Sequence, residues 1–172
     1  MRIEDVLIAL AQIAAAFAGF GGIVAALGAR SIGDLSVATR FRFRNLLVIS
    51  IGASLFALVP AVLDVAMAET PYVWTLSSAA LGLFTLGNLA AARLGARRAF
   101  SLNPKLLRRW MAVLSTSVQV AICLALFANT FGWPFNRGGM PYVSSIFALL
   151  VLAGIQFVLL ALDSTPREPN AI

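Results

Sequence analysis

The first apolar segment limits what this chain can fold into. Positions 6–29 carry no charged side chain, and Gln12 is the one polar side chain among them. As an α-helix at 1.5 Å per residue the segment is about 36 Å long, enough to cross the roughly 30 Å hydrocarbon core of a bilayer. We therefore expect a transmembrane helix here, with the rest of the chain packed around or beside it.

The composition agrees with a bilayer as the solvent. Of the 172 residues, 60% are hydrophobic and 12% are charged, and the mean hydropathy is +0.92. Soluble domains carry about 25% charged residues, so this chain has too few to cover a surface that faces water. The length corresponds to one compact domain, and the composition excludes a soluble one.

Charged residues divide the chain into five apolar segments, each long enough to span a bilayer as a helix. We expect spans at about 6–29, 45–66, 71–93, 108–132 and 141–162. None has the short apolar–polar alternation of an outer-membrane strand. The predicted fold is an all-α, polytopic transmembrane helical bundle over positions 1–162. A disordered tail is expected at 163–172, where two prolines accompany few apolar residues.

A cleaved signal peptide is the alternative interpretation of the first segment, because Ala26-Leu27-Gly28 resembles a small-x-small cleavage site. Signal peptides combine a basic start with an apolar run of about 7–15 residues. The segment lacks the basic start and exceeds that length, so a retained helix is favoured.

The basic residues gather in the loops after the first and third spans. Most of the 13 Lys and Arg residues lie there, including Arg40, Arg42, Arg44, Arg97, Arg98, Lys105, Arg108 and Arg109. Five spans place both loops on one side, so the positive-inside rule predicts an outside N-terminus and a cytoplasmic C-terminus. We expect these basic side chains to contact anionic lipid head groups, and we do not expect nucleic-acid binding.

The Trp and Tyr residues give an independent indication of where spans end. The predicted outer surface holds Tyr72, Trp74, Trp133 and Tyr142, and the predicted inner surface holds Trp110. Amphipathic rings favour the depth of the lipid head groups. We therefore expect all five side chains at a membrane interface.

Small residues recur at every fourth position of the first span. They are Ala14, Ala18, Gly22 and Ala26, which share one helical face. Such a face lets another helix approach closely, so we interpret it as a helix-packing face for a helix of the same or a second subunit. The alternative is a pore wall made from several copies of the span, with Glu4 and Asp5 at the outer mouth and Gln12 at a narrower level.

The deepest polar groups of the other spans are uncharged. Ser115, Gln119 and Cys123 share a face of the fourth span, and Thr85 and Asn88 share a face of the third. Interhelical hydrogen bonding is the plain interpretation. A polar path or solute pocket that includes Asn88 and Gln119 is the alternative.

Pro60 lies inside the second span and cannot donate a backbone hydrogen bond to the carbonyl of Phe56. We expect a kink there. In a bilayer the freed carbonyl needs another donor, so we expect Ser54 or a neighbouring helix to compensate.

The side chains of several catalytic sites are missing. With no His and a single cysteine, Cys123, the chain forms neither a Cys/His metal site nor a Ser-His-Asp triad. The run FAGFGGIVAALG lacks the Lys-Ser/Thr pair of a phosphate-binding loop. We predict no catalytic, cofactor-binding or metal-binding residues, no cofactor, and a protein that is not an enzyme.

The opening of the chain carries a resemblance. A short acidic tail, the run LAQIAAAFAGFGGIVAALGAR and a polar stretch leading to arginines resemble a group of uncharacterised small bacterial polytopic membrane proteins with a "TGFAGIV"-like first helix. The likeness covers about the first 45 residues and the general layout of spans. It implies a bacterial inner-membrane location and no activity or site residues.

Two functional hypotheses follow. The first is a small, non-enzymatic inner-membrane protein that acts as a helix-packing, assembly or interaction module. The second is a homo-oligomeric channel or small transport subunit lined by the first helix. Subunit number separates them, because the channel needs several copies around an axis.

Overall fold

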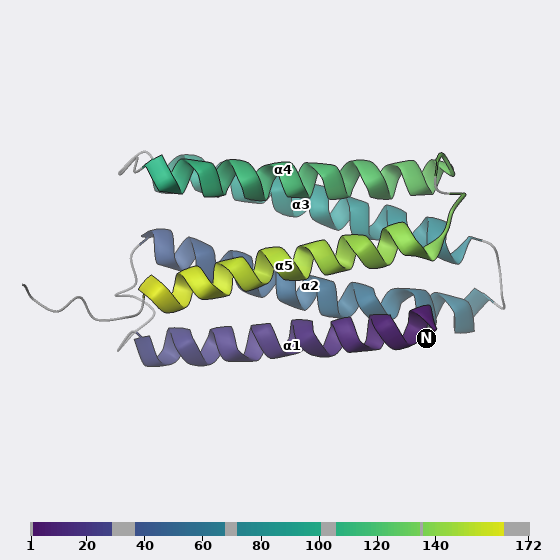
Figure 1. Ribbon diagram of the computed structural model, residues 1–172, viewed down its shortest axis with the longest axis horizontal. Coiled ribbons are helices and arrows are strands. Elements are labelled where there is room, and N and C mark those ends of the chain that lie inside the picture. The colour runs from purple at the N-terminus through teal and green to yellow at the C-terminus, as the bar shows by residue number, and fades with distance from the viewer. Residues whose placement is uncertain (1, 29–36, 68–71, 101–105, 135, 164–172) are drawn as a thin grey trace, which may run out of the picture.

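A computed structural model describes residues 2–28, 37–67, 72–134 except 101–105, and 136–163. Within this part of the chain the secondary structure is helical, without a strand. The five helices are α1 (Ile3–Gly28), α2 (Val37–Met67), α3 (Val73–Phe100), α4 (Leu106–Phe131) and α5 (Gly139–Asp163) (Figure 1). All five are long and apolar enough to cross a membrane, which confirms the prediction of an all-helical fold with five apolar helices.

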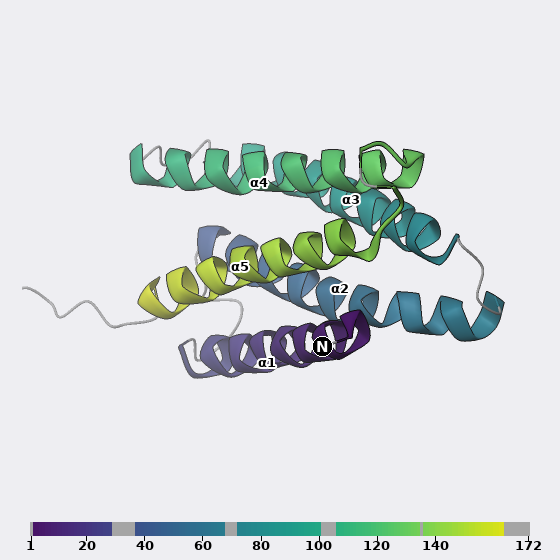
Figure 2. The ribbon, with the colours of Figure 1, turned by 45° about the vertical axis from the view of Figure 1, so that its right-hand side comes forward.

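The helices lie along one long axis in three groups. α2 and α5 occupy the middle, α1 packs on one side of them, and the α3–α4 pair packs on the other (Figures 1 and 2). Of the two expected arrangements, packing around or beside the first span, α1 has the second: α2 and α5 lie beside it. α2 is the central helix, because it contacts α1, α3 and α5 extensively.

The bundle has two distinct ends. The Glu4 end contains the starts of α1, α3 and α5, whereas the Arg44 end contains the start of α2 and the ends of α1 and α5 (Figure 1). Which end faces the cytoplasm stays a prediction from the basic residues. The predicted tail at 163–172 lies outside the described residues, apart from Asp163 at the end of α5.

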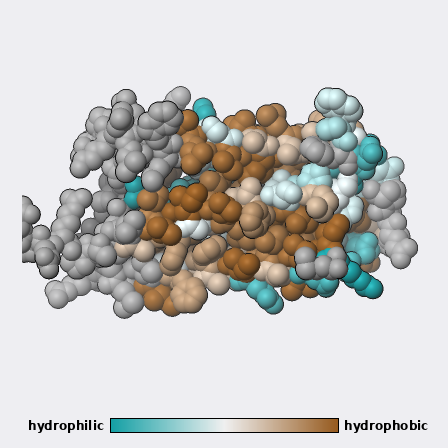
Figure 3. Space-filling model, in the orientation of Figure 1, coloured by the Kyte–Doolittle hydropathy of each residue, from teal (hydrophilic) through white to brown (hydrophobic). Residues whose placement is uncertain are grey.

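Apolar side chains both fill the core and cover the outside. The core includes fully buried residues from all five helices; examples are Ala14, Leu46, Leu81, Leu126 and Ile146. Large apolar residues are nevertheless exposed on every helix, among them Ile13, Leu55, Leu83, Leu124 and Phe147. Figure 3 shows a broad hydrophobic belt across the middle of the visible face, with hydrophilic residues gathered at the Glu4 end. An exposed apolar surface of this extent is typical of a protein that lies in a membrane, and five helices long and apolar enough to span one indicate a multi-pass membrane protein.

Two helix ends illustrate local control of the fold. The backbone N–H of Arg2 donates to Oδ2 of Asp5 at 3.0 Å, so this carboxylate caps the start of α1. At the end of α4, Gly132 takes a φ of 81°. Its N–H donates to the Asn129 carbonyl, and the next N–H donates to the Ala128 carbonyl. This pair of bonds is a Schellman motif, which glycine allows because it has no Cβ.

The contact between α2 and α3 depends on a second glycine. A Cβ at Gly52 would overlap the ring of Phe84. The missing side chain lets that ring lie on α2, where it also contacts Phe56 with ring centroids 5.1 Å apart. This contact defines one end of a pocket between the two helices.

Candidate functional site

The carbonyl freed by Pro60 receives its donor from α5. The hydroxyl of Tyr142 donates to the Phe56 carbonyl oxygen, and α2 continues as one helix past the proline. Compensation thus comes from a neighbouring helix, one of the two expected sources. Ser54 serves a different purpose, because its hydroxyl donates to the carbonyl of Ala11 in α1 at 3.2 Å.

Tyr142 faces the interior of the bundle, so its ring does not contact lipid head groups, and its depth in the membrane stays a prediction. Its side chain is fully buried, and its ring packs edge-on against Trp74 with centroids 6.0 Å apart. The unpaired carbonyl of α2 explains the burial, because a buried hydroxyl there satisfies a backbone group. Tyr72 and Trp133 are exposed, whereas the side chain of Trp110 lies outside the part that the structure describes.

A hydrogen-bonded amide pair joins α3 to α4. Nδ2 of Asn88 donates to Oε1 of Gln119 at 3.1 Å. Nε2 of Gln119 lies 3.3 Å from Oγ and 3.4 Å from the carbonyl oxygen of Ser115, so the amide donates towards its own helix. Gln119 is only 2% exposed. These bonds fix which way both amides point.

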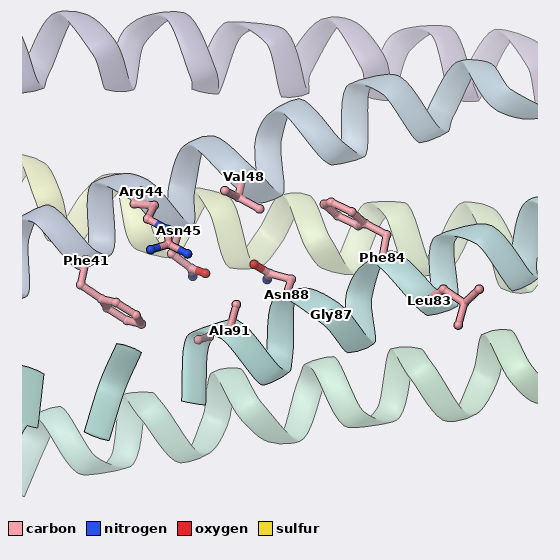
Figure 4. Close-up of a pocket in the computed structure, with 10 residues that line it drawn as sticks. Phe41, Arg44, Asn45, Val48, Leu83, Phe84, Gly87, Asn88 and Ala91 are labelled. Atoms are coloured by element: carbon pink, nitrogen blue, oxygen red, sulfur yellow. The ribbon is translucent and has the colours of Figure 1, made fainter. Parts of the chain in front are cut away.

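A pocket lies between α2 and α3 at the Arg44 end, next to this amide pair. Its volume is about 340 Å³, and its lining includes Phe41, Arg44, Asn45, Val48, Phe84 and Asn88. Figure 4 shows Arg44 and Asn45 extending from α2 towards Asn88 on α3. Asn45 is 8% exposed and forms no hydrogen bond with another described residue, whereas Arg44 is exposed.

A second pocket of about 340 Å³ lies at the Glu4 end, where α1, α2 and the start of α3 meet. Its lining includes Glu4, Leu58, Pro60, Asp64 and Trp74. Both carboxylates are exposed. The two pockets therefore have opposite charge at opposite ends of the bundle.

The predicted packing face of α1 is divided in the structure. Ala14 is fully buried inside the chain, and Ala18 is half-buried. Gly22 is half-buried with no described atom within 4 Å of where its Cβ would stand, while the side chain of Ala26 is not among those described. Gly21, one position along, meets the side chain of Leu46.

The residues of the predicted pore or polar path lie in two separate places. Glu4, Asp5 and Gln12 are exposed on α1. Asn88 and Gln119 pair between α3 and α4, on the far side of the α2–α5 layer. A single copy of the chain does not bring the two groups together.

The predicted head-group contacts are described in part. Arg40 and Arg44 are exposed and Arg42 is half-buried, all in the first turns of α2. The remaining predicted positions fall outside the described side chains or residues; they are Arg97, Arg98, Lys105, Arg108 and Arg109.

A polar contact that the sequence did not predict ties the start of α5 to α3 and α4. Nδ2 of the fully buried Asn129 donates to Oγ of Ser78 at 2.9 Å and to the carbonyl of Gly138 at 3.0 Å. Asn129 stands in the last turn of α4, and its signal in the sequence is an uncharged amide within an apolar span.

Metal-ligating and thiol side chains can be placed among the described residues. No group of three His, Cys, Asp or Glu side chains that could hold a metal occurs among them. The thiol of the buried Cys123 lies 3.9 Å from the carbonyl oxygen of Gly82, where it helps α4 pack on α3. Comparison with protein-family models, with curated proteins and with solved structures finds no match for this chain.

Proposed function

We propose that this chain is a non-enzymatic integral membrane protein that acts by assembling with other membrane helices, beginning with a second copy of itself through α1. The observation that carries the proposal is the position of Gln12. It lies near the middle of the apolar span Ile3–Ile23 and on the exposed side of α1. It forms no hydrogen bond with another residue that the structure describes.

An amide in this position is unfavourable in hydrocarbon. A buried amide without a partner costs at least about 1–3 kcal/mol, and an interhelical hydrogen bond recovers part of that. A glutamine carries both a donor and an acceptor. Two copies of Gln12 across a two-fold axis along the bilayer normal therefore satisfy one another.

The surroundings of Gln12 allow a close approach. Ala15 and Gly19 are exposed on the same side of α1, and no described atom lies within 4 Å of a Cβ built at Gly19. The opposite side of the helix is occupied by α2 and α5, which bury Leu7 and Ala14. The exposed side is therefore the one that a second copy can cover.

The proposed setting is the bacterial inner membrane, with the Arg44 end in the cytoplasm. The distribution of Lys and Arg between loops supports this orientation. The exposed Arg40 and Arg44 stand in the first turns of α2, where anionic head groups would meet them. The resemblance of the first helix to small bacterial membrane proteins supports the location.

The test is the dimer fraction of the full chain in mild detergent, measured by native mass spectrometry. Gln12→Leu should raise the dissociation constant of the dimer about 5- to 30-fold, which corresponds to about 1–2 kcal/mol for the lost amide contact. Gly19→Ile should weaken the dimer by steric exclusion. Ile13→Leu is the matched control on the same helix and should leave the dimer unchanged. A wild-type chain that stays monomeric at every protein-to-detergent ratio refutes the proposal.

The channel is the second candidate, and the exposure of Glu4, Asp5 and Gln12 on one helix favours it. It requires three or more copies around an axis, with these side chains on the lining. A subunit count of two excludes it. Ion flux into liposomes from a larger oligomer, lost in a Glu4→Ala/Asp5→Ala variant, would favour it over simple assembly.

A further inference from the structure

The pocket at the Arg44 end has the features of a ligand site. Its volume of about 340 Å³ falls within the roughly 300–1,000 Å³ of small-molecule pockets. Its lining is mainly apolar, with polar groups confined to Arg44, Asn45 and Asn88. Arg44 is the one charged residue among the described residues that line it, so a bound molecule should be an anion.

Asn45 provides the second observation. Its side chain is nine-tenths buried, lines the pocket and forms no hydrogen bond with another described residue. Figure 4 shows its amide directed into the space between α2 and α3, beside the guanidinium of Arg44. The amide atoms of Asn45 are not among the described atoms that are buried without a partner, so they are open to the pocket. An accessible amide next to a cation is suited to a polar ligand.

The amide network behind the pocket orients the third polar group. Gln119 donates towards Ser115, which leaves its Oε1 to accept from Nδ2 of Asn88. The oxygen of Asn88 is then the atom left for the pocket, and in Figure 4 it lies on the side of Arg44 and Asn45. The pocket thus presents donors from α2 and an acceptor from α3.

The apolar lining is arranged along the helix axis. Phe84 and Leu83 lie beyond the polar group, towards the middle of the bundle, and Val48 lies level with it (Figure 4). A ligand therefore needs a polar anionic head at the Arg44 end and a hydrocarbon tail that extends towards the bilayer centre.

We propose that this pocket binds an anionic glycerophospholipid whose head group carries a free hydroxyl, as phosphatidylglycerol does. The phosphate contacts Arg44 and the amide of Asn45, a head-group hydroxyl donates to Asn88, and one acyl chain lies along the apolar lining. The proposal rests on the membrane placement of the proposed function and is independent of self-association. It differs from general attraction of basic residues to lipid because it needs one defined pocket with polar and apolar lining.

The test is native mass spectrometry of the full chain in detergent with equal amounts of phosphatidylglycerol and phosphatidylcholine. Wild type should retain phosphatidylglycerol preferentially. Arg44→Gln should reduce that preference about five-fold, the equivalent of roughly 1 kcal/mol for one basic residue. Arg93→Gln is the matched control, because it removes the same charge from an exposed position of α3 outside the pocket. If the two variants lost the same share of the preference for phosphatidylglycerol, the attraction would be a diffuse effect of charge, and the proposed binding site would be refuted.

A second variant fills the pocket without changing charge. Gly87 lines it, and no described atom lies within 4 Å of a Cβ built there. Gly87→Leu should abolish the lipid preference while circular dichroism and the melting temperature show a folded helical chain. Full retention of phosphatidylglycerol by a folded G87L chain would overturn the proposal.

Two further arms define the ligand. Phosphatidylmethanol has the charge of phosphatidylglycerol without its hydroxyls and should bind more weakly, whereas equal binding refutes the role of Asn88. Excess inorganic phosphate should not displace the lipid, and displacement would assign the site to a free anion. The dimer is read in the same spectra: Q12L should lose the dimer and keep the lipid, so the two proposals fail separately.

Discussion

The two sides of the central α2–α5 layer are held together by different means. On the α3–α4 side, amide side chains bond across helices. Asn88 donates to Gln119, both in the apolar part of the bundle. Asn129 donates to Ser78 and to the backbone at the start of α5. The NH2 groups of both asparagines find acceptors within the chain, whereas Oδ1 of Asn129 and the hydroxyls of Thr75 and Ser77 are buried without a described partner.

The α1 side has less polar contact. One cross-helix hydrogen bond joins α1 to α2 among the described residues, from Ser54 to the Ala11 carbonyl. The rest of the interface is apolar packing around residues such as Ala14. Gln12, on the opposite face, has no described partner. Among the described residues, amide bonds between helices occur on the α3–α4 side, whereas α1 carries an exposed amide without a described partner. This difference supports the proposal of association through α1.

Asn129→Leu should have the largest effect, because it removes both hydrogen bonds that close the α3–α4 side. The loss of two bonds should lower the free energy of unfolding by about 2 kcal/mol. A single interhelical bond contributes at most about 1.7 kcal/mol. Steric trapping in bicelles measures the free energy of unfolding. Thr130→Val is the control, because the described side-chain bond of Thr130 is to the Leu126 carbonyl of its own helix. If both variants lose the same free energy of unfolding, hydrogen bonds between helices do not distinguish the α3–α4 side from the α1 side.

Tyr142→Phe tests the hydrogen bond between α5 and α2, the two helices of the central layer. It leaves the Phe56 carbonyl without a donor, so we expect a loss of about 1–2 kcal/mol in free energy of unfolding. In a Pro60→Ala background the loss should shrink to less than about 0.5 kcal/mol, because an alanine at this position has the backbone N–H that proline lacks. Tyr72→Phe, at an exposed position, is the control. Equal losses of free energy of unfolding in both backgrounds would show that the Tyr142 hydrogen bond does not compensate for Pro60.

Ser54→Ala should have a smaller effect on the α1 side. It removes the one described cross-helix bond to α1, and we expect a loss of about 0.6 kcal/mol, the average for such bonds in a membrane protein. Ser144→Ala, an exposed serine of α5, should change nothing. A loss as large as that of N129L would contradict the contrast between the two sides.

Gln12→Leu should have the smallest effect on the monomer. Because the side chain is exposed and without a described partner, the free energy of unfolding of the monomer should stay within about 0.5 kcal/mol of wild type. The same substitution should weaken the dimer strongly. A destabilised monomer would place Gln12 in contacts within the chain and remove the basis for assembly through α1.

Helix number was predictable from the sequence, and helix ends were less so. The second span is predicted to begin near position 45, yet α2 begins at Val37. α3 likewise continues to Phe100, beyond the predicted end near 93. Charged residues end an apolar segment without ending a helix, because arginine is a good helix former and its side chain can reach water from the first or last turn. The extra turns of α2 carry Phe41 and Arg44 into the pocket lining.

The candidate site was predictable only in pieces. Asn88, Gln119 and Ser115 stand out as polar residues in apolar spans, and their pairing across α3 and α4 depends on which helices are neighbours. Asn45 carries no such signal, since it lies at the charged edge of a span like an ordinary interfacial residue. Its burial arises because α3 covers that face of α2.

The sequence by itself determined that the chain has five apolar helices, because the length and hydrophobicity of a span depend on local composition and on the thickness of a bilayer. It also determined that Phe56 would lack a backbone donor, because Pro60 has no N–H. Only the tertiary structure decided that Tyr142 supplies that donor, that α2 rather than α1 is central, and that Arg44, Asn45 and Asn88 share a pocket. The physical reason is that bilayer-spanning helices are similar in hydrophobicity, so their order in the bundle is set by side-chain shape and by the pairing of a few polar groups.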